Sequence, residues 1–159
     1  MYRPSRDEVG AIQALTQALR STCGRRLVGA YIAKDGRPIS SGYAGPPSGE
    51  AHCDAECLAS CNANGGCHRT IHAEQNAIAW AARYGRSTEG ATLYTTLSPC
   101  RECAKLIINS GIIRVVYLEE YRNPEGISLL RGANIPCETL SVNSAIFTNL
   151  LRLCAYGGS

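Results

Sequence analysis

The stretch from residue 72 to residue 103 decides the fold: it begins with His-Ala-Glu (72–74) and ends with Ser-Pro-Cys-Arg-Glu-Cys (98–103). An apolar pattern with helical spacing follows each motif. Imidazole and thiolate are ordinary zinc ligands, and two cysteines three residues apart lie on one face of a helix. His72, Cys100 and Cys103 therefore predict a zinc ion with three protein ligands and one open position. That is the arrangement of a catalytic site, since a structural site is closed by four ligands.

Glu74 and Ser98 complete the expected site. Residues two apart on a helix do not face each other, so Glu74 is not expected to bind the ion that His72 binds. Its carboxylate is expected to carry a proton from a metal-bound water, whose pKa zinc lowers to about 7. Ser98 suits the N-cap of a helix and Pro99 its first position, which places Cys100 where the helix dipole favours a thiolate.

Each motif alone has a simpler interpretation. Pro-Cys-x-x-Cys also occurs in structural zinc knuckles and in redox pairs, and His-x-Glu by itself carries little information. Both motifs in this order, each followed by a helical pattern, match the signature of the zinc deaminases that act on nucleobases. We therefore favour catalysis over a purely structural role.

The chain resembles the deoxycytidylate (dCMP) deaminase branch of the cytidine deaminase-like superfamily. The resemblance covers most of the chain and rests on residues 72–78, 97–105 and 111–117. It implies zinc-dependent hydrolytic deamination of a cytosine nucleotide, above all dCMP, to give dUMP and ammonia. Hydroxide would add to C4 of the ring while Glu74 protonates N3 and then the departing amine.

Two alternatives to dCMP deamination are open. The same chemistry could act on cytidine, CMP or a modified nucleotide. The chain could also be a catalytically inactive, zinc-stabilised binding module. Glu74 argues against the module, because a structural ion has no use for that carboxylate.

The composition is that of one globular domain, residues 1–159. The net charge of +3 is small and the 16 basic residues are scattered, so no nucleic-acid partner is expected. No apolar run approaches the ~20 residues of a membrane span, and the N-terminus lacks the apolar stretch of a signal peptide, so no membrane contact is expected. The nine cysteines then favour a cytoplasmic location and metal binding over disulfides.

The hydrophobic patterns predict an α/β protein with a five-stranded mixed sheet and helices on both faces. Ser5 and Glu8 form a capping box, and Asp35-Gly36 is typical of a tight hairpin turn. The resemblance implies the three-layer α/β/α cytidine deaminase-like fold, with both metal-binding helices on one face. The expected strands are 27–33, 37–43, 91–96, 112–118 and 135–140, and the expected helices are 5–21, 71–84, 100–109, 124–132 and 144–155.

The segment 51–68 is rich in cysteine but has little apolar sequence that would pack against those thiols. The resemblance implies a second, structural zinc here, with one ligand from the end of the first helix. We predict that its ligands are Cys23, Cys53, Cys57 and Cys67, with Cys61 or His68 as rivals for one place. The alternative is a group of free thiols without metal.

The substrate contacts are expected mainly from loops. The stretch Gly-Tyr-Ala-Gly (42–45) matches a family stretch that reads Gly-Tyr-Asn-Gly and lines the nucleotide site, so Ala44 replaces an asparagine. The planar donor fork of an arginine suits a phosphate, and Arg25 stands where similar deaminases place a basic residue. The expected substrate-binding residues are Arg25, Tyr43, Ala44, Ser98 and Tyr121.

The resemblance also implies partners. The family generally assembles into homo-oligomers, either dimers or hexamers, and many members are activated by dCTP and inhibited by dTTP between subunits. Mg²⁺ would accompany such a nucleotide effector. Tyr43, Trp80 and Arg83 are the positions at which we expect an effector site.

Overall fold

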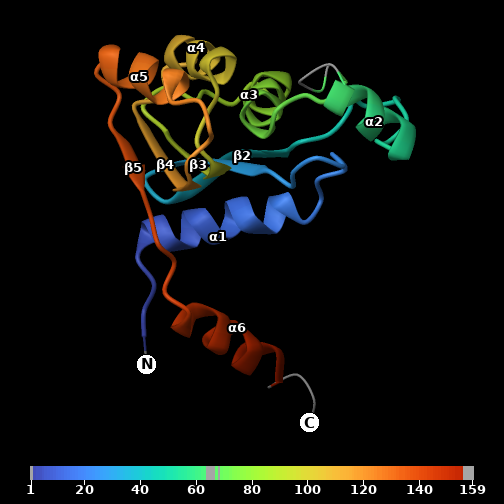
Figure 1. Ribbon diagram of the computed structural model, residues 1–159. Coiled ribbons are helices and arrows are strands. Elements are labelled where there is room, and N and C mark those ends of the chain that lie inside the picture. Colours follow the sequence, from blue (N-terminus) through green and yellow to red (C-terminus); the bar gives the residue numbers. More distant parts are fainter. Residues whose placement is uncertain (1, 64–66, 68, 156–159) are drawn as a thin grey trace.

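The computed structural model describes residues 2–63, 67 and 69–155, and its centre is a five-stranded sheet in the order β2-β1-β3-β4-β5 (Figure 1). The strands are β1 (Gly29–Lys34), β2 (Arg37–Tyr43), β3 (Thr92–Leu97), β4 (Arg114–Glu119) and β5 (Cys137–Thr139). β1 pairs antiparallel with β2 and β3, whereas β3, β4 and β5 run parallel. The predicted mixed α/β sheet is confirmed.

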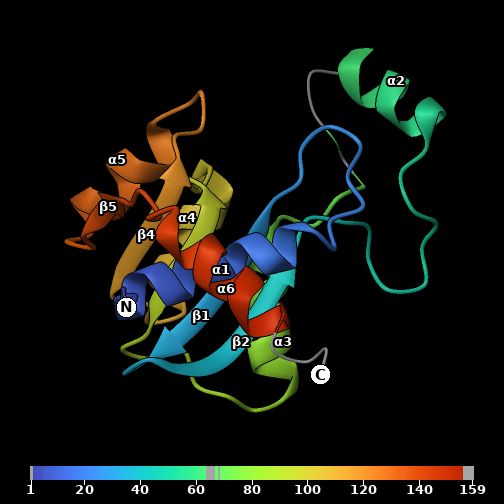
Figure 2. The same ribbon diagram turned by 90° about the horizontal axis from the view of Figure 1, so that it is seen from below.

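The helices form a layer on each face of this sheet, which confirms the three-layer prediction (Figures 1 and 2). α1 covers one face, where Ala14 packs near Tyr94 and Val116. α3, α4 and α5 cover the other, so the two helices that carry the motifs lie side by side. The helices are α1 (Arg6–Ala18), α2 (Ala55–Ala63), α3 (Ala73–Arg83), α4 (Arg101–Asn109), α5 (Glu125–Gly132) and α6 (Ala145–Ala155).

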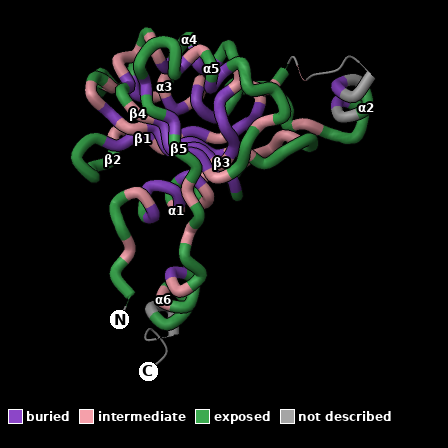
Figure 3. Tube along the Cα trace, turned by 60° about the vertical axis from the view of Figure 1, so that its left-hand side comes forward, coloured by how far each residue is buried: buried purple, intermediate pink, exposed green. Residues whose placement is uncertain are grey.

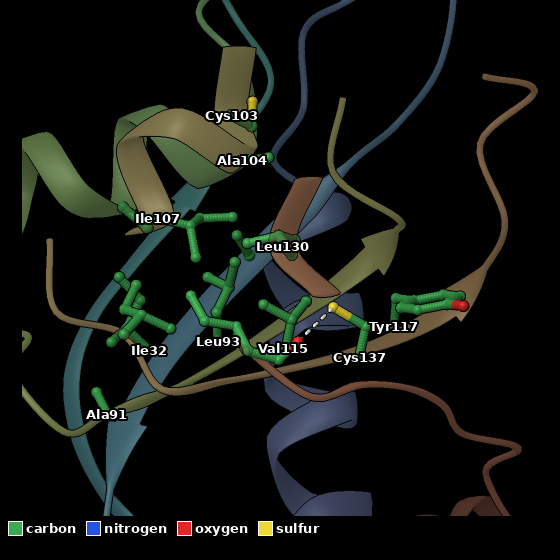
Figure 4. Packing of buried hydrophobic residues seen from close by; sticks show 14 of the residues in the cluster. Ile32, Ala91, Leu93, Cys103, Ala104, Ile107, Val115, Tyr117, Leu130 and Cys137 are labelled. Atoms are coloured by element: carbon green, nitrogen blue, oxygen red, sulfur yellow. Dashed lines mark hydrogen bonds between the residues drawn. The ribbon is translucent and has the colours of Figure 1, made fainter. Parts of the chain in front are cut away.

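The main core lies between the sheet and the α3–α4–α5 layer. Ile32, Leu93 and Val115 project from neighbouring strands toward Ile107 of α4 and Leu130 of α5, and all five are fully buried (Figure 4). Each such aliphatic side chain contributes about 1.5–3 kcal/mol relative to an exposed one. Figure 3 shows the same concentration of buried residues on the strands and on the inner helix faces.

Local sequence explains several boundaries. Ser5 accepts the Glu8 N–H, and the Glu8 carboxylate accepts the Ser5 N–H, so the predicted capping box begins α1. Asp35 and Gly36 both have positive φ, 53° and 75°, as a two-residue type I′ hairpin turn requires. Gly85 (φ 62°) follows the end of α3, and Gly111 (φ 73°) follows the end of α4.

α2 was not expected from the sequence. Its start has a local cause, because Asp54 Oδ1 accepts the N–H of Cys57 at 2.7 Å and so satisfies one donor of the first turn. α2 lies beyond one end of the sheet (Figure 2), and α6 stands apart from the sheet on the α1 side. Among the described residues, no helix combines the length and hydrophobicity that crossing a membrane requires.

The two edges of the sheet are β2 and β5. β2 contains Pro38, and its register with β1 shifts between Ile32 and Ala33 as in a β-bulge. β5 has only three residues, and Glu138 and Thr139 within it are exposed.

Candidate active site and metal centre

Two helix N-termini meet at the residues that the motifs singled out. His72 is the N-cap of α3, with its N–H bonded to Gln75 Oε1 (3.1 Å) and its carbonyl accepting the Asn76 N–H (2.9 Å). Cys100 is the N-cap of α4, and its carbonyl accepts the Ala104 N–H (2.9 Å). The positive ends of two helices therefore face the same point, which favours thiolates and other anions there.

The N-cap of α4 differs from the sequence prediction. Ser98 was expected at that position, but the N-cap lies two residues later, at Cys100, and the helix begins at Arg101. The Ser98 hydroxyl instead accepts the N–H of Tyr121 at 2.7 Å, and Ser98 is buried. Ser98 thus joins the start of the metal-binding turn to the loop after β4.

His72, Cys100 and Cys103 converge as a ligand set. His72 Nδ1 lies 3.4 Å from Cys100 Sγ and 3.3 Å from Cys103 Sγ. Bonds of ~2.0 Å to nitrogen and ~2.3 Å to sulfur at tetrahedral angles put these atoms about 3.5 Å apart, so the set fits zinc. Cys103 is buried, Cys100 is half-buried and His72 is exposed, so the cluster is open on one side, as a fourth, exchangeable ligand requires.

The electrostatics of the cluster favour a bound cation. Hydrogen bonding with the Cys103 side chain and with His72 lowers the pKa of Cys100 to about 3. The hydrogen bond to Cys100 raises the pKa of His72. The hydrogen bond between Cys103 and Cys100, together with burial, raises the pKa of Cys103. One thiolate is therefore already stabilised beside two protons that a metal ion would displace.

Glu74 lies next to the cluster and is buried, with 4% of its surface exposed. The Cys103 thiol donates to Glu74 Oε2 at 3.6 Å. Burial raises the pKa of the Glu74 carboxyl, so this group can hold a proton more readily than an exposed glutamate. A carboxyl with these properties beside a metal centre can serve as a general acid and base.

α3 is fixed against β2, and this packing holds His72 and Glu74 at the metal-binding cluster. Asn76 Nδ2 donates to the Tyr43 carbonyl (3.0 Å), and the Ser40 hydroxyl donates to the Ala77 carbonyl (2.7 Å). Gly42 permits this close approach, because a Cβ there would collide with the backbone of α3.

A cavity of about 600 Å³ opens in front of the cluster. Of the predicted substrate contacts, Arg25, Ala44, Ser98 and Tyr121 line it, together with His72, Glu74 and Cys100. Tyr43 is not among the lining residues, and its described contact is the carbonyl that binds Asn76. Ala44 is held by its backbone, which accepts from Thr22 N–H (3.1 Å) and Ser21 Oγ (2.7 Å).

Several lining residues were missed by the sequence argument. Four arginines line the cavity: Arg25, which was predicted, and Arg26, Arg101 and Arg122, which were not. Arg26 pairs with Glu119, and Arg101 lies 3.8 Å from Glu125. Within the described part of the chain, Arg25 and Arg122 form no ion pair, so they can receive an anion. Arg122 directly follows the predicted Tyr121, and that adjacency was the signal that could have found it.

The cysteine-rich segment gathers three of its predicted ligands. The sulfurs of Cys53, Cys57 and Cys67 lie within 4.8 Å of one another, and Cys61 Sγ lies 3.9 Å from Cys57 Sγ. Cys23 is not in this group, although it lines the same cavity as Cys67. We call Cys53, Cys57, Cys61 and Cys67 the cysteine cluster. His68, one of the predicted rivals, lies outside the described residues.

Two of the expected effector positions, Trp80 and Arg83, form a stack with Tyr84 at the end of α3. The rings of Trp80 and Tyr84 are 5.4 Å apart at 18°, and the Arg83 guanidinium lies 4.9 Å from the Trp80 ring. Arg83 and Tyr84 are exposed. Tyr43 belongs to β2, against which α3 packs.

The fold and site together define a zinc-binding deaminase domain. This chain belongs to the family described as the cytidine and deoxycytidylate deaminase zinc-binding region, whose model matches residues 4–119.

The family relatives include proteins and solved structures. The ComE operon protein 2 of Bacillus subtilis (strain 168) is 40% identical over 148 residues, covering 92% of this chain and 77% of that protein. The deoxycytidylate deaminase of Enterobacteria phage T2 is 37% identical and covers 84% of this chain and 90% of that protein. The crystal structure of the dCMP deaminase from cyanophage S-TIM5 in complex with dCMP and dUMP matches with a TM-score of 0.77 and 32% identity, over 88% of this chain and 100% of that one.

Proposed function

We propose that this protein is a zinc-dependent hydrolase that converts dCMP and water to dUMP and ammonia. The observation that carries the proposal is the open ligand set of His72, Cys100 and Cys103 with a buried carboxyl, Glu74, beside it. A closed structural site would have no use for such a carboxyl. Relatives with the name deoxycytidylate deaminase support the choice of substrate.

The metal ligands and Glu74 would have separate roles in the reaction. Zinc held by His72, Cys100 and Cys103 would lower the pKa of a water molecule to about 7 and so supply a nucleophile for C4 of the cytosine ring. Glu74 takes up one proton of that water and gives it to N3 as the oxygen adds to C4. It then takes the proton of the new C4 hydroxyl and gives it to the amino group, which leaves as ammonia while the C4 carbonyl forms. The site is expected to bind most tightly the tetrahedral arrangement between these two proton transfers.

The arginines that line the cavity suit the 5′-phosphate of the substrate. Arg25 and Arg122 offer donor forks that match phosphate oxygens, and neither is held by a carboxylate in the described structure. The backbone N–H of Tyr121 donates to the Ser98 hydroxyl, and this hydrogen bond holds the neighbouring Arg122 at the cavity. Nucleosides without the phosphate are therefore expected to be poorer substrates.

The decisive experiment replaces Glu74. Glu74→Ala and the isosteric Glu74→Gln are expected to keep the fold and the catalytic zinc but to lose turnover by about 10²–10⁴-fold, because positioned proton transfer contributes that much. Ammonia release and the ultraviolet change would be followed with dCMP, CMP, cytidine and dCTP. Glu50→Ala, at an exposed glutamate, is the control. Substantial turnover by Glu74→Ala would falsify this mechanism. Turnover of another nucleotide in preference to dCMP would identify that nucleotide as the substrate instead.

We also propose that the cysteine cluster holds a second, structural zinc. Three thiols within 4.8 Å of one another, with Cys61 close to Cys57, have the donor type and number of a closed thiolate site. Burial raises the pKa of Cys67, but hydrogen bonding with Thr70 and with Cys61 brings it down to about 7, so one thiolate forms readily. Cys23, which lines the same cavity as Cys67, stays a predicted ligand.

Metal analysis tests the second zinc. Two zinc ions per chain are expected in fresh, reduced protein. Because a closed thiolate site contributes directly to folding, Cys53→Ser should lower the unfolding midpoint more than Cys100→Ser does. A single zinc per chain, or equal effects of the two substitutions, would contradict the proposal.

The remaining proposals concern location and assembly. Eight cysteines are free thiols in the described structure, which supports a cytoplasmic location. The exposed apolar residues Phe147, Leu150 and Leu151 of α6 support assembly into a homo-oligomer, a dimer or hexamer.

The Trp80–Arg83 stack is the proposed contact for dCTP or dTTP with Mg²⁺. Light scattering for mass, and dCMP turnover with and without each effector, would test these points.

A further inference from the structure

Thr70 lies where the cysteine cluster meets the nucleotide cavity, whose lining includes Thr70 and one member of the cluster, Cys67. The Cys67 thiol donates to its hydroxyl oxygen at 3.2 Å, and Cys53 Sγ lies 3.8 Å from the same oxygen. Thr70 also lines the cavity and precedes the ligand His72 by two residues.

Backbone hydrogen bonds connect the chain around Thr70 to the cavity wall. Ile71 exchanges two backbone hydrogen bonds with Gly45, at 2.9 and 3.3 Å, and Gly45 follows Ala44 of the wall. On the other side of the cluster, the backbone of Gly24 hydrogen-bonds to Cys53, and Arg25 is the next residue. The cluster is thus bonded to two of the segments that frame the cavity.

We propose that Thr70 is a positioning residue, whose hydroxyl couples the cysteine cluster to the nucleotide cavity. Thr70 has no described contact with Glu74 or with a catalytic ligand, so it acts through the wall and not on the reacting atoms. Without the hydroxyl, the wall occupies its binding-competent position in a smaller fraction of molecules, and apparent nucleotide affinity falls by that fraction. Coupling between two sites is reciprocal, so an occupied cavity must also protect the cluster.

The first test measures affinity. Thr70→Val removes the hydroxyl and keeps the shape, whereas Thr70→Ser keeps the hydroxyl. Thr16→Val, on α1, removes a hydroxyl that only donates to the Ile12 carbonyl and is the control. Thr70→Val should weaken dUMP binding in calorimetry, and raise KM, by about tenfold with kcat within about threefold, as expected for the loss of one hydrogen bond. Thr70→Ser and Thr16→Val should stay within about threefold of the parent.

The second test uses the cluster and needs no turnover. The rate at which iodoacetamide alkylates Cys53 would be measured by peptide mass spectrometry with and without dUMP. Cys53 is not among the cavity-lining residues, so dUMP does not cover it directly. dUMP should slow this alkylation about tenfold in the parent, and Thr70→Val should alkylate faster and lose the dUMP effect.

The outcomes separate this inference from the proposed function on which it rests. If the parent neither binds dUMP nor deaminates dCMP, the proposed function fails. Alkylation of Cys53 without nucleotide, compared between Thr70→Val and Thr70→Ser, still tests the link. Parent-like dUMP affinity in Thr70→Val, or equal defects in Thr70→Ser and Thr70→Val, would overturn it. If Thr70→Val does not fold, the dUMP effect in the parent and the Thr70→Ser result decide.

Discussion

Gly126 of α5 offers a sharp test of how the fold positions the catalytic zinc. It is buried against the turn that carries the ligand Cys100, and a Cβ there would collide with the Pro99 carbonyl oxygen. The same Cβ would lie 2.7 Å from the carbonyl carbon of Cys100 and 2.8 Å from its oxygen. Ordinary carbon contacts are ~3.5–4.0 Å, so Gly126→Ala must move α5 and the turn apart by about 1 Å.

A shift of that size exceeds what a zinc site tolerates. Metal–ligand distances are held to within about 0.2 Å, and a misplacement of ~1 Å can lower turnover about 10²-fold. We therefore expect Gly126→Ala to lower kcat/KM for dCMP by about 100-fold and to weaken retention of the catalytic zinc. The overpacking should cost about 1–3 kcal/mol of unfolding free energy. The better helix propensity of alanine offsets up to ~1 kcal/mol of that cost.

Gly132, the last residue of α5, is the matched control, because nothing lies within 4 Å of a Cβ built there. Urea unfolding, zinc analysis and steady-state kinetics would be measured for Gly126→Ala and Gly132→Ala side by side. Gly132→Ala should resemble the parent. Full zinc content and full activity in Gly126→Ala would refute the view that this contact fixes the metal-binding turn.

Two further predictions concern stability and specificity. Two hydrogen bonds from Arg114, both 2.8 Å, lower the pKa of Asp7, so their contribution is present above pH ~4 and lost as the pH falls through the folded pKa. Urea unfolding should therefore show Asp7→Asn about 1–2 kcal/mol less stable at pH 7, a gap that closes toward pH 2; a constant gap would contradict this. Because alanine at position 44 cannot hydrogen-bond to a sugar, Ala44→Asn should raise the preference for dCMP over CMP in competition assays. No change, with CMP already excluded, would assign sugar recognition to another residue.

The sequence was sufficient where a local pattern determines the structure. The Asp35-Gly36 turn needs only two residues that accept positive φ, and periodicity located five helices and all five strands. The ligand set was predictable because zinc restricts both the residue types and their spacing. α2 was missed because its cysteines and alanines form no clear apolar stripe, and its cap, Asp54, was read as part of a loop.

Contacts between distant segments were the part that local reasoning could not supply. Ser98 has the chemistry of an N-cap, but its partner is the N–H of Tyr121, 23 residues later. Arg122 reaches the cavity because β3 and β4 run parallel, so the loop after β4 lies beside the metal-binding turn after β3. Neither contact follows from the propensities of the residues concerned.

The edges of the sheet have a consequence for how copies of this chain can associate. An unpaired strand edge can template β-pairing with another molecule, which leads to aggregation. Pro38 removes one N–H from β2, and the bulge next to it in the same strand distorts the ladder. β5 offers only three residues, with a charged side chain at Glu138. Both edges therefore oppose the addition of a foreign strand, and an assembly of this protein is expected to form through helix surfaces, with the sheet of each molecule kept separate.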